Sequence, residues 1–163
     1  MNDMTEEHYW NEADFIRMER SLMVSLGFSF EDIQALSVKG LPEWTAPNLN
    51  FDVPVNSNGN LVIGEDRNDN QIFIELSTLR VLVGDGKQLM NSSGHLLRKT
   101  LKLYAVLVEK ATVLDENAFI DNQIPNDFIE AFHAKLALLD PVALAKGCFW
   151  QVEICRLLNH TEI

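Results

Sequence analysis

Hydrophobic residues in the N-terminal part of the chain recur three or four positions apart, which is the spacing of one helix face. The pattern predicts a helix from about Glu12 to Leu26, stopped by Gly27. Its buried face would consist of Phe15, Met18, Leu22 and Leu26. A second, short helix is predicted over residues 28–36, where Ser29 begins an S-x-x-D start pattern. The following "GLPEWTAPNLNF", at residues 40–51, has two prolines and little periodicity, so an irregular crossing segment is predicted.

Three short apolar runs in the middle of the chain have the length and composition of β-strands. They are "NLVIGE", "QIFIEL" and "RVLVGD", at residues 60–65, 71–76 and 80–85, and they are rich in Val, Ile and Phe. In the second run, Ile72 and Ile74 share one face of the predicted strand. The connections are too short to hold a crossover helix, so neighbouring strands are predicted to be antiparallel.

The C-terminal half is predicted to contain three helices. The first begins at "MNSS", where Asn91 or Ser92 would act as the N-cap. Its buried stripe is predicted to be Leu96, Leu97, Leu101, Tyr104, Leu107 and Val108. The second covers residues 125–139 and has a proline near its first turn. The third is predicted as one continuous helix over residues 140–158, with Asp140 as its cap.

Together these elements predict one α+β domain over residues 1–163, with a central, mainly antiparallel sheet flanked by N-terminal and C-terminal helices. A tail of about residues 1–11 is expected to be flexible. No apolar run reaches the length of about 18 residues that a membrane span needs. The acidic start lacks the basic and apolar parts of a signal peptide, so we expect a cytoplasmic protein.

Charge narrows the classes of partner. The chain has 24 acidic and 13 basic residues, a net charge of −11 and a pI near 4.7. Such a surface repels DNA, RNA and anionic membranes, so we expect neither nucleic acid nor membrane as a partner. A cationic protein would be attracted to it, although the same charge also serves solubility alone.

The polar stretch "GEDRNDNQ" between two predicted strands resembles the start of a calcium loop, because Asp66, Asn68 and Asn70 alternate as its first ligands do. The rest of the loop does not fit. Gln71 occupies the position that requires glycine, and Ser77 occupies the position that requires a bidentate glutamate. The stretch is therefore predicted to be a hairpin turn and not a metal site.

No recognisable catalytic constellation stands out in the sequence. Ser92, Ser93 and His95 are sequence neighbours, which does not supply a triad, and helix capping explains both serines. His95 is expected to be exposed and neutral in a first helical turn. Cys148 and Cys155 are predicted to lie buried on one helix face, with apolar neighbours raising the pKa of Cys148. These patterns favour a protein without enzymatic activity and without a cofactor.

Trp44 lies in the segment predicted to be irregular, next to the acidic Glu43. A tryptophan beside acids suits a binding anchor for a cationic partner. The alternative is that Trp44 covers one edge of the core, which is the commoner role of aromatic residues. The sequence leaves both interpretations open.

The order of these motifs resembles the SUKH immunity superfamily, whose fold is like that of cell-wall assembly regulators. "KGLPEW" follows the N-terminal helices, "LVIGEDRNDNQIFIEL" and "RVLVGDG" follow as strands and turns, and "MNSS" opens the long helix. The late "LLDPVALAKGCFWQVEICRLLNH" is similar to a C-terminal helical extension found in one bacterial clade. The resemblance covers about residues 20 to 160.

The resemblance implies an α+β immunity protein that binds and neutralises a polymorphic or contact-dependent bacterial toxin domain, often one that acts on nucleic acid. Such toxins need basic grooves, which an acidic protein can match. The family offers no catalytic residues to carry over. The residues expected to contact a basic toxin domain are Glu43, Trp44, Glu65, Asp66 and Asp69. The first alternative is a cytoplasmic adaptor or regulatory binding module of the same fold without a toxin partner, and a small hydrolase is the second.

Overall fold

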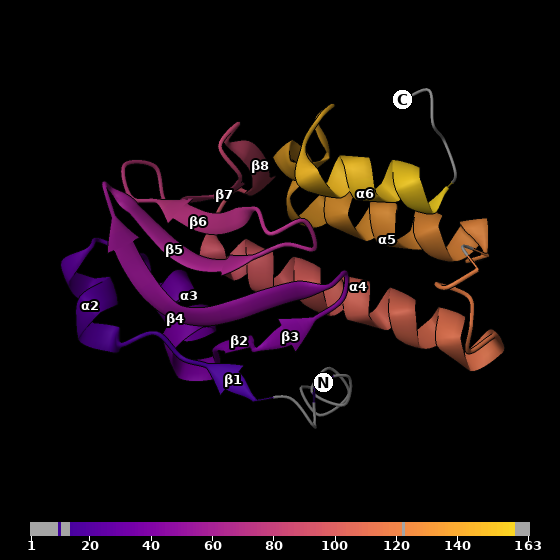
Figure 1. Ribbon diagram of the computed structural model, residues 1–163, viewed down its shortest axis with the longest axis horizontal. Coiled ribbons are helices and arrows are strands. Elements are labelled where there is room, and N and C mark those ends of the chain that lie inside the picture. Colours follow the sequence, from indigo (N-terminus) through magenta and orange to yellow (C-terminus); the bar gives the residue numbers. More distant parts are fainter. Residues whose placement is uncertain (1–9, 11–13, 122, 159–163) are drawn as a thin grey trace.

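The computed structural model describes Trp10 and residues 14–121 and 123–158, and within them it has an α+β fold. A curled antiparallel sheet lies in front of the long helix α4 (Gly94–Leu114) in Figure 1. Helices α2 (Arg20–Ser25) and α3 (Phe30–Ile33) lie at one end, and α5 (Asn126–Leu139) and α6 (Phe149–Leu157) lie at the other. The predicted fold class is therefore confirmed. The tail predicted over residues 1–11 lies outside the described residues, apart from Trp10.

The main sheet has six strands in sequence order, and each pairs antiparallel with its neighbours. They are β3 (Trp44–Thr45), β4 (Leu49–Ser57), β5 (Asn60–Glu65), β6 (Gln71–Glu75), β7 (Arg80–Val83) and β8 (Gln88–Asn91). The three predicted strands correspond to β5, β6 and β7, so their positions and their antiparallel pairing are confirmed.

The irregular segment predicted over residues 40–51 is instead part of the sheet, because β3 and the start of β4 lie in it. The longest described strand, β4, was not predicted because Pro54 lies within it, and proline argues against the interior of a strand. The register of β4 against β5 shifts between Phe51 and Val55, at a bulge. A bulge is one of the few places in a sheet where proline is tolerated.

The N-terminal helix predicted over Glu12–Leu26 is wrong for residues 14–19, while Glu12 and Ala13 lie outside the described residues. Phe15–Ile16 form the short strand β1, which pairs with β2 (Leu41–Pro42), and only α2 (Arg20–Ser25) is helical. Pairing with a distant strand overrides the local helical periodicity, which is a tertiary effect. Gly27 ends the helix as predicted, in the left-handed conformation with φ of 87°.

The next helix begins as predicted at Ser29, whose side chain accepts a hydrogen bond from the backbone of Asp32. This helix, α3 (Phe30–Ile33), continues as the π-helical turn η2 (Gln34–Lys39). The long helix is α4 (Gly94–Leu114), and its N-cap is Ser93 rather than the predicted Asn91 or Ser92. In its predicted stripe, Leu97, Leu101, Tyr104 and Leu107 are buried, while Leu96 and Val108 are half-buried.

The second C-terminal helix, α5 (Asn126–Leu139), is confirmed, whereas the single helix predicted over residues 140–158 is wrong. That segment forms the 3-10 helix η3 (Pro141–Leu144) and the helix α6 (Phe149–Leu157). Gly147 separates them at a φ of 88°, a left-handed conformation that no α-helix can contain. No described helix is long and apolar enough to span a bilayer.

Asp140 occupies the predicted N-cap position, at the start of η3, but its side chain makes no capping hydrogen bond. The side chains of Asn91, Ser92 and Asp140 instead form a polar network between β8, α4 and η3. Asp140 accepts hydrogen bonds from the Asn91 amide and from both the backbone and the hydroxyl of Ser92. The carbonyl oxygen of the Asn91 side chain accepts a hydrogen bond from the indole of Trp150, which is completely buried. Each of these buried polar groups thus has a partner, which holds the C-terminal helices on the sheet.

Candidate protein-interaction surface

One end of the sheet presents an exposed row of side chains on the face turned away from the core. Cross-strand pairing places Trp44 beside Asn50, Asn50 beside Glu65, and Glu65 beside Gln71. All four residues are exposed, and we call them the Trp44 row. Neighbouring strands lie about 4.8 Å apart, so Trp44 and Glu65 are separated by roughly 10 Å. The fold thus brings together two of the predicted contact residues, Trp44 and Glu65.

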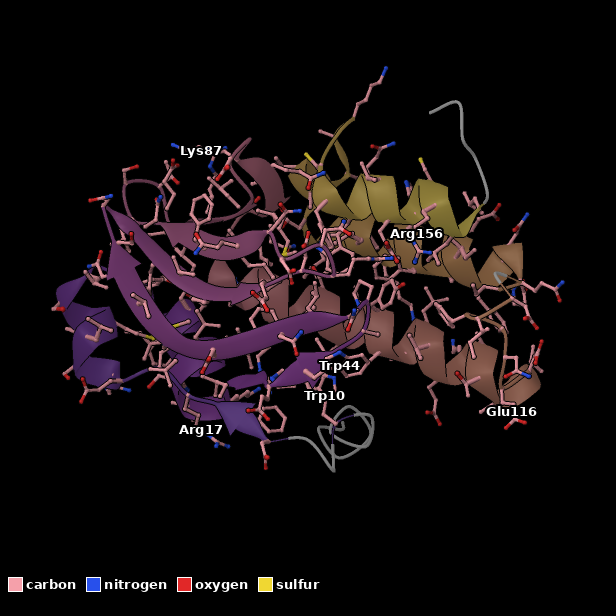
Figure 2. All side chains as sticks on the ribbon, in the orientation of Figure 1. Trp10, Arg17, Trp44, Lys87, Glu116 and Arg156 are labelled. Carbon is pink, nitrogen blue, oxygen red and sulfur yellow. The ribbon has the colours of Figure 1, made fainter. Side chains whose placement is uncertain are left out.

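Trp44 lies outside the hydrophobic core, with 53% of its surface exposed. Its indole nitrogen donates a hydrogen bond of 2.8 Å to the side chain of Asn48, which restrains the ring. Trp44 is labelled in Figure 2. A different tryptophan covers the core at this edge: Trp10 is 5% exposed, and its indole donates to the hydroxyl of Thr45. Trp44 therefore does not cover the core. Its ring is exposed and held by a hydrogen bond, as a binding anchor would require.

The turn between β5 and β6 is organised by Asp66. One carboxylate oxygen accepts hydrogen bonds from the backbone of Asn68 at 2.8 Å and of Asn70 at 2.9 Å. The other oxygen accepts from the Asn70 side chain. Asp66 is buried, which corrects the expectation that it is displayed to a partner. The carboxylate holds the predicted hairpin turn together, and no described group of His, Cys, Asp or Glu residues is arranged to hold a metal ion.

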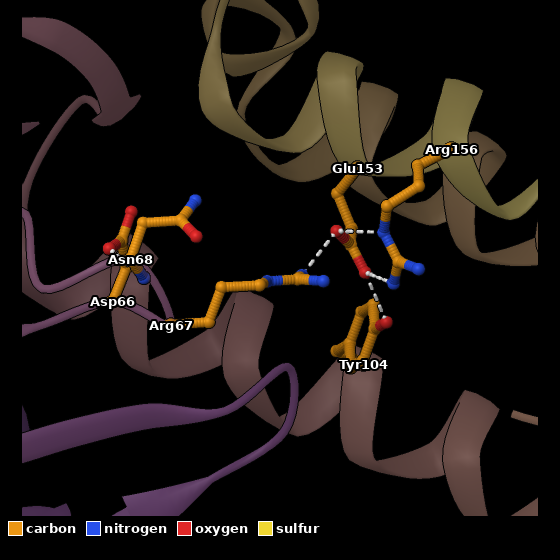
Figure 3. Close-up of polar contacts among 6 residues, drawn as sticks. All are labelled: Asp66, Arg67, Asn68, Tyr104, Glu153 and Arg156. Carbon is orange, nitrogen blue, oxygen red and sulfur yellow. Dashed lines mark hydrogen bonds and ion pairs between the residues drawn. The ribbon is translucent and has the colours of Figure 1, made fainter. Parts of the chain in front are cut away.

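The same turn is tied to the C-terminal helix through Arg67, whose guanidinium lies 2.8 Å from the carboxylate of Glu153 on α6 (Figure 3). Glu153 is 4% exposed. It also accepts two hydrogen bonds from Arg156 and one of 2.6 Å from the hydroxyl of Tyr104 on α4. We call these four residues the Glu153 cluster. A buried carboxylate with two cations and a hydroxyl is well compensated.

The electrostatics of the Glu153 cluster follow from this geometry. Burial and then the negative charge of Glu153 raise the pKa of the Tyr104 hydroxyl well above its usual range. The hydrogen bond to Glu153 raises the pKa of Arg156. Tyr104 therefore stays protonated and Arg156 stays charged, and the carboxylate is occupied on both oxygens. The cluster acts as a fixed connection that positions the turn.

Exposed acids lie within the Trp44 row, at Glu65, and beside it. Glu43 precedes Trp44, and Asp52 follows Asn50 by two positions on β4. Glu65 and Asp69 flank the part of the turn that Asp66 and Arg67 hold in place, and both are exposed. An aromatic ring among carboxylates suits a cationic protein partner, since cations are attracted both to the acids and to the ring face.

Sequence reasoning did not identify Asn50 and Gln71, the two polar members of the Trp44 row. The strand that carries Asn50 was itself missed, so its outward positions could not be assigned. The alternation in "NLNFDV" would have indicated them, because residues two apart share a face. The same face continues to a shallow hollow of about 200 Å³ that Val62 and Phe73 line.

A second cluster has the residue types of a hydrolase triad but not its geometry. The Nδ1 atom of His95 lies 2.8 Å from the carboxylate of Asp32 and 3.1 Å from the hydroxyl of Ser93. A triad histidine uses one ring nitrogen for each partner, whereas His95 uses the same nitrogen for both. When Nδ1 carries the proton that it donates to Asp32, it cannot accept the proton of Ser93. His95 is also half-buried and paired, which corrects the expectation that it is exposed.

The two cysteines do not share a helix face. Cys148 lies just before α6 and Cys155 lies within it, and both are half-buried and free, so the prediction of two buried residues on one helix face is wrong. Burial, followed by the negative charge of Asp140, raises the pKa of the Cys148 thiol, as predicted. A thiol with a raised pKa is a poor nucleophile at neutral pH.

In comparisons with known proteins, no family model, no curated protein and no solved structure matches the chain. Membership of the SUKH superfamily therefore stays a prediction. The structural features that bear on function are the Trp44 row, the acids around it and the Glu153 cluster beneath the turn.

Proposed function

We propose that this protein is an immunity protein that binds and neutralises a cationic bacterial toxin domain in the cytoplasm. The observation that carries the proposal is the Trp44 row, in which a fixed, half-exposed tryptophan lies among exposed carboxylates on a sheet face. Tryptophan is enriched among the residues that dominate binding energy at protein interfaces.

Charge supports a basic partner over an acidic one. The net charge of −11 attracts a cationic domain over a distance of about 8 Å at physiological salt. Complementary charge mainly speeds association, whereas a buried aromatic anchor mainly slows dissociation. A toxin that acts on nucleic acid needs a basic groove, so it fits a partner of this kind. Nucleic acid itself is repelled.

The Glu153 cluster supports a preformed surface. Arg67 connects the turn to α6 across the domain, and Asp66 fixes the backbone inside the turn. Glu65 and Asp69 are thereby presented without a large loss of conformational freedom on binding. Preorganisation of this kind increases affinity because less entropy is lost on association.

The test begins with the neighbouring gene: if it encodes a large secreted protein with a variable C-terminal domain, that domain is the toxin to use. Co-expression with this chain should rescue growth, and the purified pair should associate in a salt-dependent manner. Glu65→Lys should slow association by more than tenfold. Glu116→Lys changes the net charge by the same amount at an exposed site far from Trp44 in Figure 2, and it should have little effect.

Three outcomes would contradict the proposal. Equal effects of the two charge reversals would mean that the Trp44 row is not the contact surface. An association rate that does not change between about 50 and 200 mM salt would contradict the electrostatic part. Binding to a cationic protein that is not toxic, with no rescue of growth, would favour the adaptor alternative.

A further inference from the structure

A groove of about 730 Å³ lies on a different part of the molecule, between α3 and η2 on one side and α4 and α5 on the other. Six apolar side chains contribute to its lining: Phe30, Ala35, Leu103, Val106, Leu138 and Leu139. Phe30 is 66% exposed and Leu138 is 89% exposed. A fold that leaves such large apolar side chains around a concave surface is suited to an apolar ligand.

The charge of the groove is opposite to that of the whole protein. Four of the chain's seven lysines line it, namely Lys39, Lys99, Lys102 and Lys135, against one carboxylate, Glu31. Lysines on three different elements therefore meet at one concave site of a protein whose net charge is −11. An anionic group would be favoured there, whereas most of the remaining surface repels it.

Two other polar residues of the groove already have structural roles. The Arg98 side chain donates a hydrogen bond of 2.7 Å to the backbone of Gly40 and stacks on the ring of Trp10 at 5.3 Å. His95 is paired with the buried carboxylate of Asp32. The lysines thus supply the cationic character that a ligand would meet.

We propose that this groove binds a single-chain amphiphile with an anionic head group, of the long-chain carboxylate type. The alkyl chain would lie on the apolar lining, and the carboxylate would lie among Lys39, Lys99 and Lys135, which are exposed. The volume falls within the range of about 300–1,000 Å³ that is typical of small-molecule sites. The proposal is independent of the toxin-binding proposal, because the two surfaces favour ligands of opposite charge.

The test is calorimetric titration of the full chain with dodecanoate. We expect saturable binding that tightens about fourfold for each methylene added between octanoate and dodecanoate, because each buried methylene contributes a constant increment. Dodecyltrimethylammonium, which has the same chain and the opposite charge, should bind much more weakly. Equal affinity for the two amphiphiles, or no saturable heat with dodecanoate at millimolar concentration, would overturn the proposal.

Two charge reversals locate the site. Lys99→Glu should weaken dodecanoate binding between about threefold and thirtyfold, because it replaces an attraction by a repulsion. Lys146→Glu makes the same charge change at an exposed residue outside the groove and should have little effect. Equal losses in both variants would place the ligand elsewhere. Thermal melting of both variants checks that the fold is intact.

Two further measurements separate other occupants. Sedimentation with vesicles of anionic phospholipid should leave the protein in solution, because its net charge is repelled by such a surface. Co-sedimentation that Lys99→Glu abolishes would overturn the carboxylate proposal in favour of a membrane surface. If Lys99→Glu leaves dodecanoate binding unchanged but abolishes binding of the toxin domain, the groove is a protein-binding site and the proposal is wrong.

Discussion

Replacing Arg67 by methionine tests the connection between the β5–β6 turn and α6. The change removes the guanidinium that lies 2.8 Å from Glu153, while most of the aliphatic part of the side chain is retained. A hydrogen bond between charged groups contributes about 1.5–3 kcal/mol to the free energy of unfolding. Arg67 is 32% exposed, so solvent screening places the expected loss at the lower end, about 1.5–2 kcal/mol.

The loss stays below the cost of an uncompensated buried charge, about 3–5 kcal/mol, because Arg156 and Tyr104 still bind the carboxylate of Glu153. For a domain of this size, each kcal/mol lowers the unfolding temperature by about 2–4 °C. Arg67→Met should therefore lower the unfolding temperature by about 3–8 °C. Differential scanning calorimetry measures this shift, and urea denaturation gives the free energy itself.

Arg80→Met is the matched control, since Arg80 also pairs with a glutamate beside a turn of the sheet. Its guanidinium lies 3.9 Å from Glu75 and is 48% exposed. An exposed pair at this distance contributes little, so no resolvable change in unfolding temperature is expected. Equal shifts in the two variants would refute the reasoning. So would a double-mutant cycle in which Arg67→Met and Glu153→Gln are additive, because contacting partners should be coupled.

Three further predictions follow from the same structure. Trp44→Ala should change the unfolding temperature by less than about 2 °C, because the ring lies outside the core. The same change should speed dissociation of the toxin domain at least tenfold in surface plasmon resonance, and a large loss of stability would contradict this prediction. Gly64→Ala should destabilise the domain by about 1–3 kcal/mol or more, because the added Cβ would collide with the backbone oxygen of Asn50. Urea denaturation measures the loss, and an unchanged midpoint would show that β4 and β5 can move apart to accept the methyl group. Folding raises the pKa of Tyr104, so the stabilisation that this shift provides is present below about pH 10 and is lost as the pH rises toward the folded pKa. The urea midpoint of the native chain should therefore fall more steeply between about pH 9 and 11 than that of Tyr104→Phe. Parallel pH profiles of the two proteins would contradict the assignment.

The sequence by itself determined the elements whose pattern is strictly local. The strands β5, β6 and β7 follow from β-branched and aromatic runs joined by short turns, and the helices α4 and α5 follow from apolar stripes at helical spacing. Gly27 and Ser29 mark helix ends because their own backbone and side-chain chemistry decides the outcome within a few residues. The acidic net charge and the hairpin turn after β5 could also be predicted from the sequence alone.

Only the tertiary structure decided which distant segments of the chain pack against each other. Phe15 and Ile16 fit a helix pattern as well as a strand pattern. Their pairing with the strand at Leu41–Pro42 could not be predicted from the residues next to them in the sequence. The same holds for the two tryptophans at this edge, of which Trp10 is buried and Trp44 is exposed. Periodicity along the chain shows that a face is apolar, but it does not show which distant segment packs against it.

The candidate sites show the same division between local and distant information. Asp66 and Arg67 were visible as polar turn residues, yet the acceptor of Arg67 lies 86 positions away on α6. The lysines of the groove come from segments that are separated along the chain and share no motif. The local sequence determines which polar groups a turn carries. Packing between elements that are far apart in the sequence determines which partners those groups bind.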